Sequence, residues 1–298
     1  MKKLSDIRMR DPYILTEENQ YYLYGTIGET EGEKNLYVFK SDDLENWSEP
    51  TVIFTLSDDS WAEKELWAPE VHKYNDKFYL FISILGKNGL RGVQIAVSDT
   101  PDGMFIPVAN RPANPLDKSC IDGTLYVEDG VPYMVYSRDW PDNYDSEQGV
   151  YIGQVCAIQL SDDLSEPVGD DFILFESPDA ALSAGKPVTH DFFGETVTRY
   201  GSDGPFIVRG KNGSLILMWS PIPEGNYIIA SAVSKSGKIR GEWTHHTTPI
   251  FANNGGHAML FKDLSGNHKL CFHYPEIYFS ERPKLVDVEI LDDTITVK

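Results

Sequence analysis

The chain has 298 residues and a formal net charge of −20, with 41% hydrophobic and 24% charged residues. Nucleic-acid binding needs clustered lysines and arginines that neutralise phosphates, and no such cluster is present, so we expect no nucleic-acid partner. The same charge argues against an anionic membrane. An acidic, solubilising surface explains it without identifying a substrate.

Cysteine usage and the N-terminus bear on the compartment. Cys120, Cys156 and Cys271 are odd in number and widely spaced, without a C-x-x-C pattern, so we interpret them as buried free thiols. Residues 1–3 resemble the start of a signal peptide, but charged residues follow and no apolar segment does. No window has the length of a membrane span. We expect a cytoplasmic protein from the chain as given, or a periplasmic or secreted one if a leader has been removed.

Aromatic and β-branched residues in alternating runs predict strands. In chain order, the expected strands form five groups: 21–26 and 36–39; 78–83 and 93–98; 124–127, 132–137 and 151–160; 206–208, 215–220 and 228–234; 258–261, 269–273 and 285–290. No helical run of useful length competes with them. The insertion over residues 170–198 is expected to hold a short helix or a lid, with Phe192, Phe193 and Glu195 overhanging the centre of the fold.

A short turn with a polar residue opens each group. These leading residues are Asp11, Glu70, Asp122, Asp203 and His257. They recur about every 50 to 60 residues, with one longer interval that contains the insertion, and such a repeat is typical of propeller blades. We therefore predict an all-β, five-bladed β-propeller that forms a single domain over residues 1–298. In that fold the leading residues converge on the central channel.

The turns match known motifs when they are taken in order. They read Arg-Asp-Pro-Tyr at 10–13, Trp-Ala-Pro-Glu at 67–70, Ile-Asp-Gly at 121–123, Asp-Gly-Pro-Phe at 203–206 and Gly-Gly-His at 255–257. This order resembles glycoside hydrolase family 43, the five-bladed propeller arabinofuranosidases and xylosidases. The resemblance implies an inverting hydrolase of α-L-arabinofuranosyl or β-D-xylosyl linkages in plant polysaccharides or oligosaccharides, with no organic cofactor.

The resemblance also implies roles for the acids. Asp11 matches the general base, and Asp122 matches the third carboxylate, which orients the general acid and tunes its pKa. An inverting hydrolase holds base and acid about 6.5–9.5 Å apart, and the acid must stay protonated near neutral pH. A nearby carboxylate and partial burial raise the pKa of such an acid.

The chain departs from the family pattern at the general acid. The family has a Glu in a Glu-Gly-Pro turn, and this chain has Asp203, whose side chain is one methylene shorter. Either the backbone comes closer, as Gly201 and Gly204 would allow, or Glu195 or Glu70 donates the proton instead.

Four further residues are candidates for substrate binding. Trp67 and Trp140, beside Glu70 and Asp139, are expected to stack on the apolar face of a sugar. Glu70 is expected to bind a substrate hydroxyl or to pair with an arginine. Arg282, in a Glu-Arg-Pro segment of the last group, is expected to orient a carboxylate or to form a surface pair.

His257 and the overall activity leave alternatives open. In similar family members a histidine at this blade faces a water or a metal ion, so the resemblance adds a structural Ca²⁺ or Na⁺ at His257, although one histidine is not a metal site. The motifs identify the scaffold better than the sugar. A galactan-active propeller glycosidase, or a propeller that binds carbohydrate without cleaving it, remains an alternative because position 203 lacks the Glu.

Overall fold

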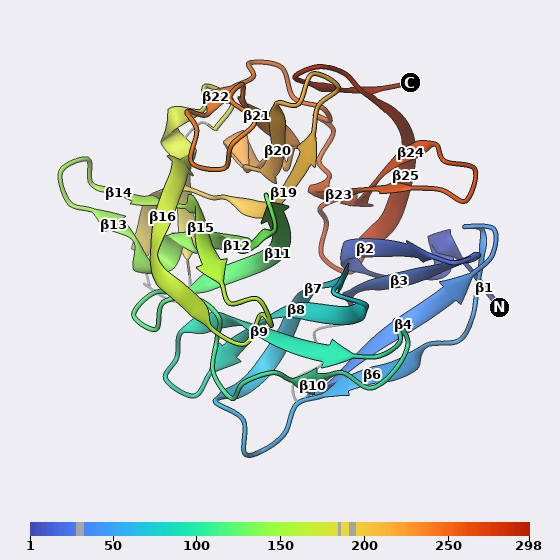
Figure 1. Ribbon diagram of the computed structural model, residues 1–298. Coiled ribbons are helices and arrows are strands. Elements are labelled where there is room, and N and C mark those ends of the chain that lie inside the picture. Colours follow the sequence, from blue (N-terminus) through green and yellow to red (C-terminus); the bar gives the residue numbers. More distant parts are fainter. Residues whose placement is uncertain (28–32, 184–185, 191–194) are drawn as a thin grey trace.

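The computed structural model describes residues 1–27, 33–183, 186–190 and 195–298, and for residues 186–190 and 195 it describes the backbone alone. Five four-stranded antiparallel sheets follow one another in chain order around a common centre (Figure 1). This arrangement confirms the expected all-β, five-bladed β-propeller.

Each blade takes its strands in chain order from the centre outward. Blade 1 contains β2 (Arg10–Glu17), β3 (Gln20–Thr26), β4 (Asn35–Ser41) and β6 (Thr51–Thr55); blade 2 contains β7 (Ala62–Tyr74), β8 (Lys77–Gly86), β9 (Arg91–Ser98) and β10 (Ile106–Pro107). Blade 3 contains β11 (Cys120–Glu128), β12 (Val131–Arg138), β15 (Gln154–Leu160) and β16 (Pro167–Glu176); blade 4 contains β19 (Asp203–Arg209), β20 (Leu215–Ser220), β21 (Ala230–Ser234) and β22 (Thr244–His245). Blade 5 contains β23 (Gly256–Lys262), β24 (His268–Tyr274), β25 (Arg282–Ile290) and β26 (Ile295–Val297).

Smaller elements decorate the blades. A strand pair joins β1 (Lys2–Lys3) to β5 (Asn46–Trp47), and a further sheet has the order β13 (Tyr144–Asp145), β14 (Val150–Ile152), β18 (Glu195–Tyr200) and β17 (Lys186–His190). In the described residues, helical structure is limited to the 3₁₀ turns η1 (Leu4–Asp6), η2 (Trp140–Asp142), η3 (Ser177–Asp179) and η4 (Pro223–Gly225). None of these is long and apolar enough to cross a membrane.

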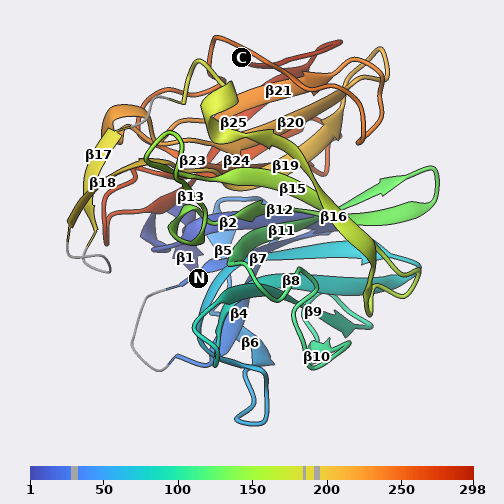
Figure 2. The same cartoon turned by 90° about the vertical axis from the view of Figure 1, so that its left-hand side faces the viewer.

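The predicted insertion contributes to four elements. Its first residues complete β16, its Pro178 segment lies in the short turn η3, and its later residues form β17 and most of β18. In the edge-on view these two strands project from one face of the propeller (Figure 2). The predicted lid residues Phe192 and Phe193 lie outside the described residues.

Strands inside a blade are buried on both faces, and β20 shows the consequence for the sequence. Its residues form one continuous apolar run, although alternate side chains point to opposite sides of the sheet. Leu215, Leu217 and Trp219 pack with residues of blade 3, whereas Ile216 and Met218 pack with residues of blade 5. The core therefore consists of layers between neighbouring blades. All three cysteines are buried free thiols in these layers, as predicted.

The innermost strand of every blade carries a β-bulge near its start. The register shifts fall at Arg10/Tyr13, Trp67/Glu70, Ile121/Thr124, Asp203/Phe206 and Gly256/Met259. Each bulge holds one residue in the left-handed region, namely Asp11 at φ 50°, Ala68 at 46°, Asp122 at 58°, Gly204 at 54° and His257 at 53°. A bulge changes the direction of a side chain. The predicted leading residue itself occupies the bulge in three blades. In the other two the left-handed residue is Ala68, two positions before Glu70, and Gly204, one position after Asp203.

Candidate active site

The backbone N–H of each bulge residue donates a hydrogen bond to a side chain of the preceding blade. The acceptors stand at one equivalent position in the second strands: Thr26 Oγ1 for Ala68 at 2.8 Å, Ser83 Oγ for Asp122 at 2.7 Å, Ser220 Oγ for His257 at 2.8 Å, and His273 Nδ1 for Asp11 at 3.1 Å. These contacts hold the strand starts at a common level in the fold.

The junction between blades 3 and 4 breaks this pattern. Ser137 stands at the equivalent position of β12, but its buried hydroxyl has no partner among the described residues. The N–H of Gly204 instead donates to Asp122 Oδ2 at 2.9 Å. The exception therefore ties the carboxylate of Asp122 to the turn that carries Asp203.

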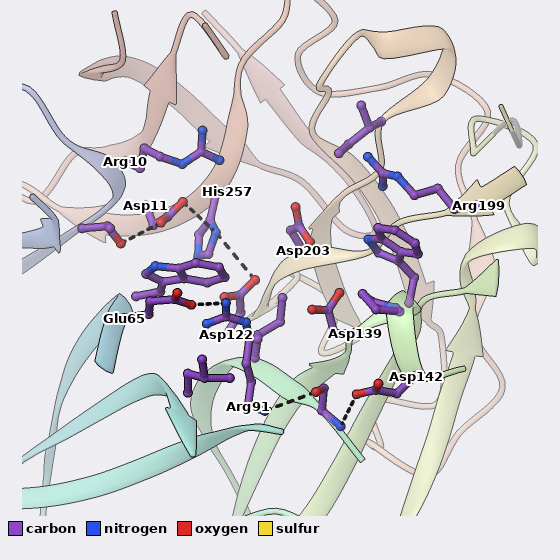
Figure 3. A pocket seen from close by; sticks show the side chains of 18 of the residues that line it. Arg10, Asp11, Glu65, Arg91, Asp122, Asp139, Asp142, Arg199, Asp203 and His257 are labelled. Atoms are coloured by element: carbon purple, nitrogen blue, oxygen red, sulfur yellow. Dashed lines mark hydrogen bonds and ion pairs between the residues drawn. The ribbon is translucent and has the colours of Figure 1, made fainter. Parts of the chain in front are cut away.

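A pocket with a volume of about 770 Å³ opens where the strand starts meet (Figure 3). This size is within the range for small-molecule sites. The strand starts contribute Asp11, Asp122, Asp203 and His257, and surrounding segments add Arg10, Thr26, Lys64, Glu65, Trp67, Arg91, Asp139, Trp140, Asp142, Arg199, Tyr227 and Glu276. The structure thus brings together all three acids that the motifs indicate.

Asp11 is held in its ionised form on one side of the pocket. Its Oδ2 accepts a hydrogen bond from Thr26 Oγ1 at 2.8 Å, and its Oδ1 lies 3.2 Å from His257 Nδ1. Burial by itself raises the pKa of Asp11, but the charge of His257 and its hydrogen bond, with a smaller effect from Arg10, hold that pKa well below its usual range. An ionised carboxylate in a fixed orientation can accept a proton from water.

His257 lies between two carboxylates. Its Nδ1 is 3.2 Å from Asp11 Oδ1 and 3.8 Å from Asp122 Oδ2. Burial lowers the pKa of His257, but the charges of Asp11 and Asp122 outweigh it and raise the pKa to about 10. His257 is therefore an imidazolium at neutral pH. For Asp122, burial raises the pKa above its ordinary value although His257 opposes the shift.

A second set of hydrogen bonds holds the backbone of Asp11, and the sequence motifs did not indicate it. His273 accepts the N–H of Asp11 at Nδ1, so its proton lies on Nε2, which is 2.6 Å from Glu276 Oε2. Arg10 Nη1 donates to both oxygens of Glu276 at 2.8 and 2.9 Å. The contacts fix the histidine tautomer and with it the backbone of Asp11.

Asp203 on the other side of the pocket has the opposite protonation behaviour. Its Oδ2 accepts a hydrogen bond from the hydroxyl of the buried Tyr227 at 3.2 Å. Burial raises the pKa of Asp203, the charges of Asp122 and Asp139 add to the shift, and the pKa reaches about 7. A carboxyl that keeps its proton near neutral pH can act as an acid.

Asp139 is a fourth acid of the pocket, which the sequence had indicated only as a neighbour of Trp140. It follows directly on β12 and precedes η2, and its carboxyl lines the pocket. Burial raises the pKa of Asp139 to about 6, with Arg91 opposing the shift and Asp122 adding to it. Its position in the sequence could have indicated this role. Asp139 directly follows the second strand of its blade, and the ends of the second strands lie beside the starts of the innermost strands.

Both predicted aromatic platforms line the pocket, and each carries an arginine. The guanidinium carbon of Arg91 lies 3.4 Å from the ring centre of Trp67, and that of Arg199 lies 4.8 Å from the ring centre of Trp140. Arg91 also forms an ion pair with Glu65. One face of the Trp67 ring is therefore covered by a cation, so a sugar could stack only on the opposite face.

Three predicted site residues are not placed in the pocket by the described side chains. Glu70 does not line it, and its Oε2 lies 2.8 Å from His72 Nε2. The guanidinium of Arg282 donates to the backbone carbonyls of Ser5, Phe279 and Glu281, away from the acids. Glu195 begins β18, but its side chain lies outside the described residues.

The described residues do not form a protein-ligated site for the Ca²⁺ or Na⁺ suggested at His257. Within the described part of the chain, no group of three or more His, Cys, Asp or Glu side chains is arranged to hold a metal ion. The Nδ1 of His257 also faces Asp11 in an ion pair.

Substitution of Gly204 by alanine is expected to destabilise the protein and displace His257. A Cβ at position 204 would lie 2.8 Å from the ring of His257, and the backbone has φ +54°. Left-handed backbone costs alanine about 1–2 kcal/mol, and overpacking typically adds about 1–3 kcal/mol. Urea unfolding should show a larger loss for Gly204→Ala than for Gly213→Ala, because Gly213 has φ +90° with open space around it. Equal losses would contradict a steric contact with His257.

Fold and site together define the class of the protein. A propeller that gathers an ionised and a protonated carboxyl in one pocket has the chemical groups of a glycoside hydrolase. The family described as "Glycosyl hydrolases family 43" matches residues 4–288. The chain belongs to this family.

Individual relatives agree with this assignment. The crystal structure of an endo-arabinase from Bacteroides thetaiotaomicron VPI-5482 has a TM-score of 0.86 and 33% identity, with 97% of each chain covered. A "Xylosidase/arabinosidase 43A" of Humicola insolens is 35% identical over 35% of this chain and 32% of its own length. An "Extracellular endo-alpha-(1->5)-L-arabinanase 1" of Bacillus subtilis (strain 168) is 29% identical over 44% of each chain. The matches to these two curated relatives thus span less than half of their length.

Proposed function

We propose that this protein is an inverting glycosidase that hydrolyses α-L-arabinofuranosyl or β-D-xylosyl linkages in plant polysaccharides or oligosaccharides. One observation carries the proposal: Asp11, with a lowered pKa, and Asp203, with a pKa of about 7, face the same pocket from different blades. Inversion requires a base and an acid on opposite sides of the sugar. The names of the relatives support an arabinose- or xylose-containing substrate.

In the proposed reaction Asp11 takes a proton from a water molecule as the water oxygen attacks the anomeric carbon. Asp203 gives its proton to the glycosidic oxygen as the bond from that oxygen to the anomeric carbon breaks. Asp122 raises the pKa of Asp203 and accepts the N–H of Gly204, so that it both tunes and orients the acid turn. The products are two free hydroxyl compounds, and no organic cofactor takes part.

The substrate is tested by hydrolysis of matched arabinosides, xylosides and galactosides, followed by arabinan, xylan and galactan. We expect turnover of an arabinoside or a xyloside, and NMR of the first product should show the inverted anomer. Turnover of galactosides alone would favour the galactan-active alternative. Sugar binding without turnover, in the wild type and in Asp203→Glu, would favour a non-catalytic propeller, which the Asp at position 203 makes a specific alternative.

Asp203→Asn is expected to lower the rate on unactivated oligosaccharides by about 10²- to 10³-fold, since a general acid contributes about 10²–10⁴. A nitrophenyl glycoside should be affected much less, because its leaving group departs without a proton. The measurement is kcat/KM for both substrates.

The matched control for this substitution is Asp162→Asn, an exposed acid in the turn between β15 and β16. It should retain wild-type rates on both substrates. An equal loss of rate on both substrates in Asp203→Asn would contradict proton donation by Asp203.

A further inference from the structure

The chain carries its proton donor on an Asp where a longer Glu is expected, and a second acid lies on the same side of the pocket. We propose that Asp139 is a catalytic carboxyl that shares one proton with Asp203, so that the pair acts as the general acid. This inference rests on the proposed glycosidase function. It deepens that function by assigning a residue outside the five motif turns.

The two acids come from separate blades. Asp203 begins β19 of blade 4, and Asp139 follows β12 of blade 3. The N–H of Asp139 donates to the carbonyl of Ser119 at 2.9 Å, which anchors its backbone beside the start of β11. Both acids line the pocket, and Figure 3 shows them on the same side of it, across from Asp11.

The side chain of Asp139 is available for this role. It forms no ion pair and no hydrogen bond to another side chain in the described part of the molecule, although it is half-buried. Arg91, the cation that opposes its shift, is paired with Glu65. Asp203 has the hydroxyl of Tyr227 as its side-chain partner. Neither acid therefore has a dedicated counter-charge, in contrast to Asp11 with His257.

Charge then favours one proton for two carboxyls. Asp139 raises the pKa of Asp203, and Asp122 raises the pKa of both. Two partly buried carboxylates that line one pocket without a dedicated cation do not both ionise readily, so the pair retains a proton near neutral pH. Arg199, which lies near both acids, limits the shift of Asp203 without removing it.

The sharing also compensates for the missing methylene. In the proposed step the pair releases its proton to the glycosidic oxygen, the bond from that oxygen to the anomeric carbon breaks, and Asp11 receives a proton from the attacking water. The pair becomes doubly ionised for a moment, with Arg199 nearby, and then regains a proton from solvent. Two acids that approach from different blades cover a wider range of positions of the leaving oxygen than one short side chain.

The test compares Asp139→Asn with wild type on an unactivated oligosaccharide and on a nitrophenyl glycoside. We expect kcat/KM to fall by about 10²-fold or more on the oligosaccharide and by less than about 10-fold on the nitrophenyl glycoside. The alkaline limb of the pH profile should move to lower pH, because Asp203 loses the negative neighbour that raises its pKa. Glu147→Gln, an exposed acid in the same β12–β15 connection, should leave both rates unchanged.

Unchanged rates and an unmoved alkaline limb in Asp139→Asn would overturn the proposal. An equal loss on both substrates with an unmoved limb would also overturn it, since that pattern indicates a structural role.

A second readout does not depend on activity. Infrared titration should detect a carboxyl in the wild type that keeps its proton to near neutral pH. In Asp139→Asn the band of this carboxyl should shift and titrate at lower pH, and in Asp203→Asn it should be lost. If the wild type hydrolyses no glycoside, the proposed function fails, and this titration still decides whether the two acids share a proton. A protonated carboxyl that persists unchanged in Asp139→Asn would overturn the sharing.

Discussion

Replacement of Asp11 by asparagine is expected to lower hydrolysis by about 10²- to 10⁴-fold while the fold remains intact. The amide cannot take a proton from water, yet it can keep the hydrogen bond from Thr26 Oγ1. Asparagine also tolerates the left-handed backbone at this position, where φ is 50°. The measurements are kcat on the best substrate and the far-ultraviolet circular dichroism spectrum.

Asp76→Asn provides a control with the same backbone geometry. Asp76 also has a left-handed backbone, with φ 62°, but it is exposed in the turn between β7 and β8. It should retain wild-type activity. Wild-type turnover in Asp11→Asn would exclude Asp11 as the base.

Replacement of His257 by asparagine is expected to destabilise the protein by about 3–5 kcal/mol near pH 6, the usual cost of removing one partner of a buried ion pair. The imidazolium lies between Asp11 and Asp122, and its loss leaves two buried carboxylates without their cation. Asparagine accepts the left-handed backbone at this position, so backbone strain does not explain the loss.

The effect of this substitution should depend on pH. The pKa of His257 is about 10 in the folded protein, above the ordinary value of about 6.5. Its contribution to stability is therefore fully present below about pH 6.5 and is lost as pH rises through 10. Urea unfolding at pH 6 and at pH 10 should show a smaller difference from wild type at the higher pH. His268→Asn, away from the pocket, serves as a control, and a difference that is constant with pH would contradict the ion pair.

The repeat of polar turns predicted the number of blades. Each blade must bury its faces against its neighbours, and all five units therefore share the same order of turn and apolar strands. The same repeat did not show which residue of each turn faces the pocket. Glu70 was predicted as a leading residue, but Ala68 occupies the bulge of its blade, and Glu70 pairs with His72 outside the pocket lining. Composition does not reveal a bulge, since it depends on how two strands pair.

Residues outside the repeats were hardest to foresee. Asp139 reaches the pocket from the end of β12, Arg199 from β18 and Tyr227 from the connection between β20 and β21, and these segments share no motif with one another. His273 lies in none of the five motif turns, and its contact with the N–H of Asp11 depends on the closure of blade 5 onto blade 1. Such contacts join residues that are distant in the chain, so local pattern does not specify them.

The all-β class and the five blades follow from the sequence because strand periodicity and turn chemistry are local properties. The family and the candidate acids Asp11, Asp122 and Asp203 follow from the resemblance of the motifs in these turns. Tertiary structure alone decided which acid carries a charge. The distances from Asp11 to His257, and the burial of Asp203 beside Asp122 and Asp139, move the pKa values of the two acids in opposite directions. Protonation depends on burial and on neighbouring charge, and both arise only when separate blades meet.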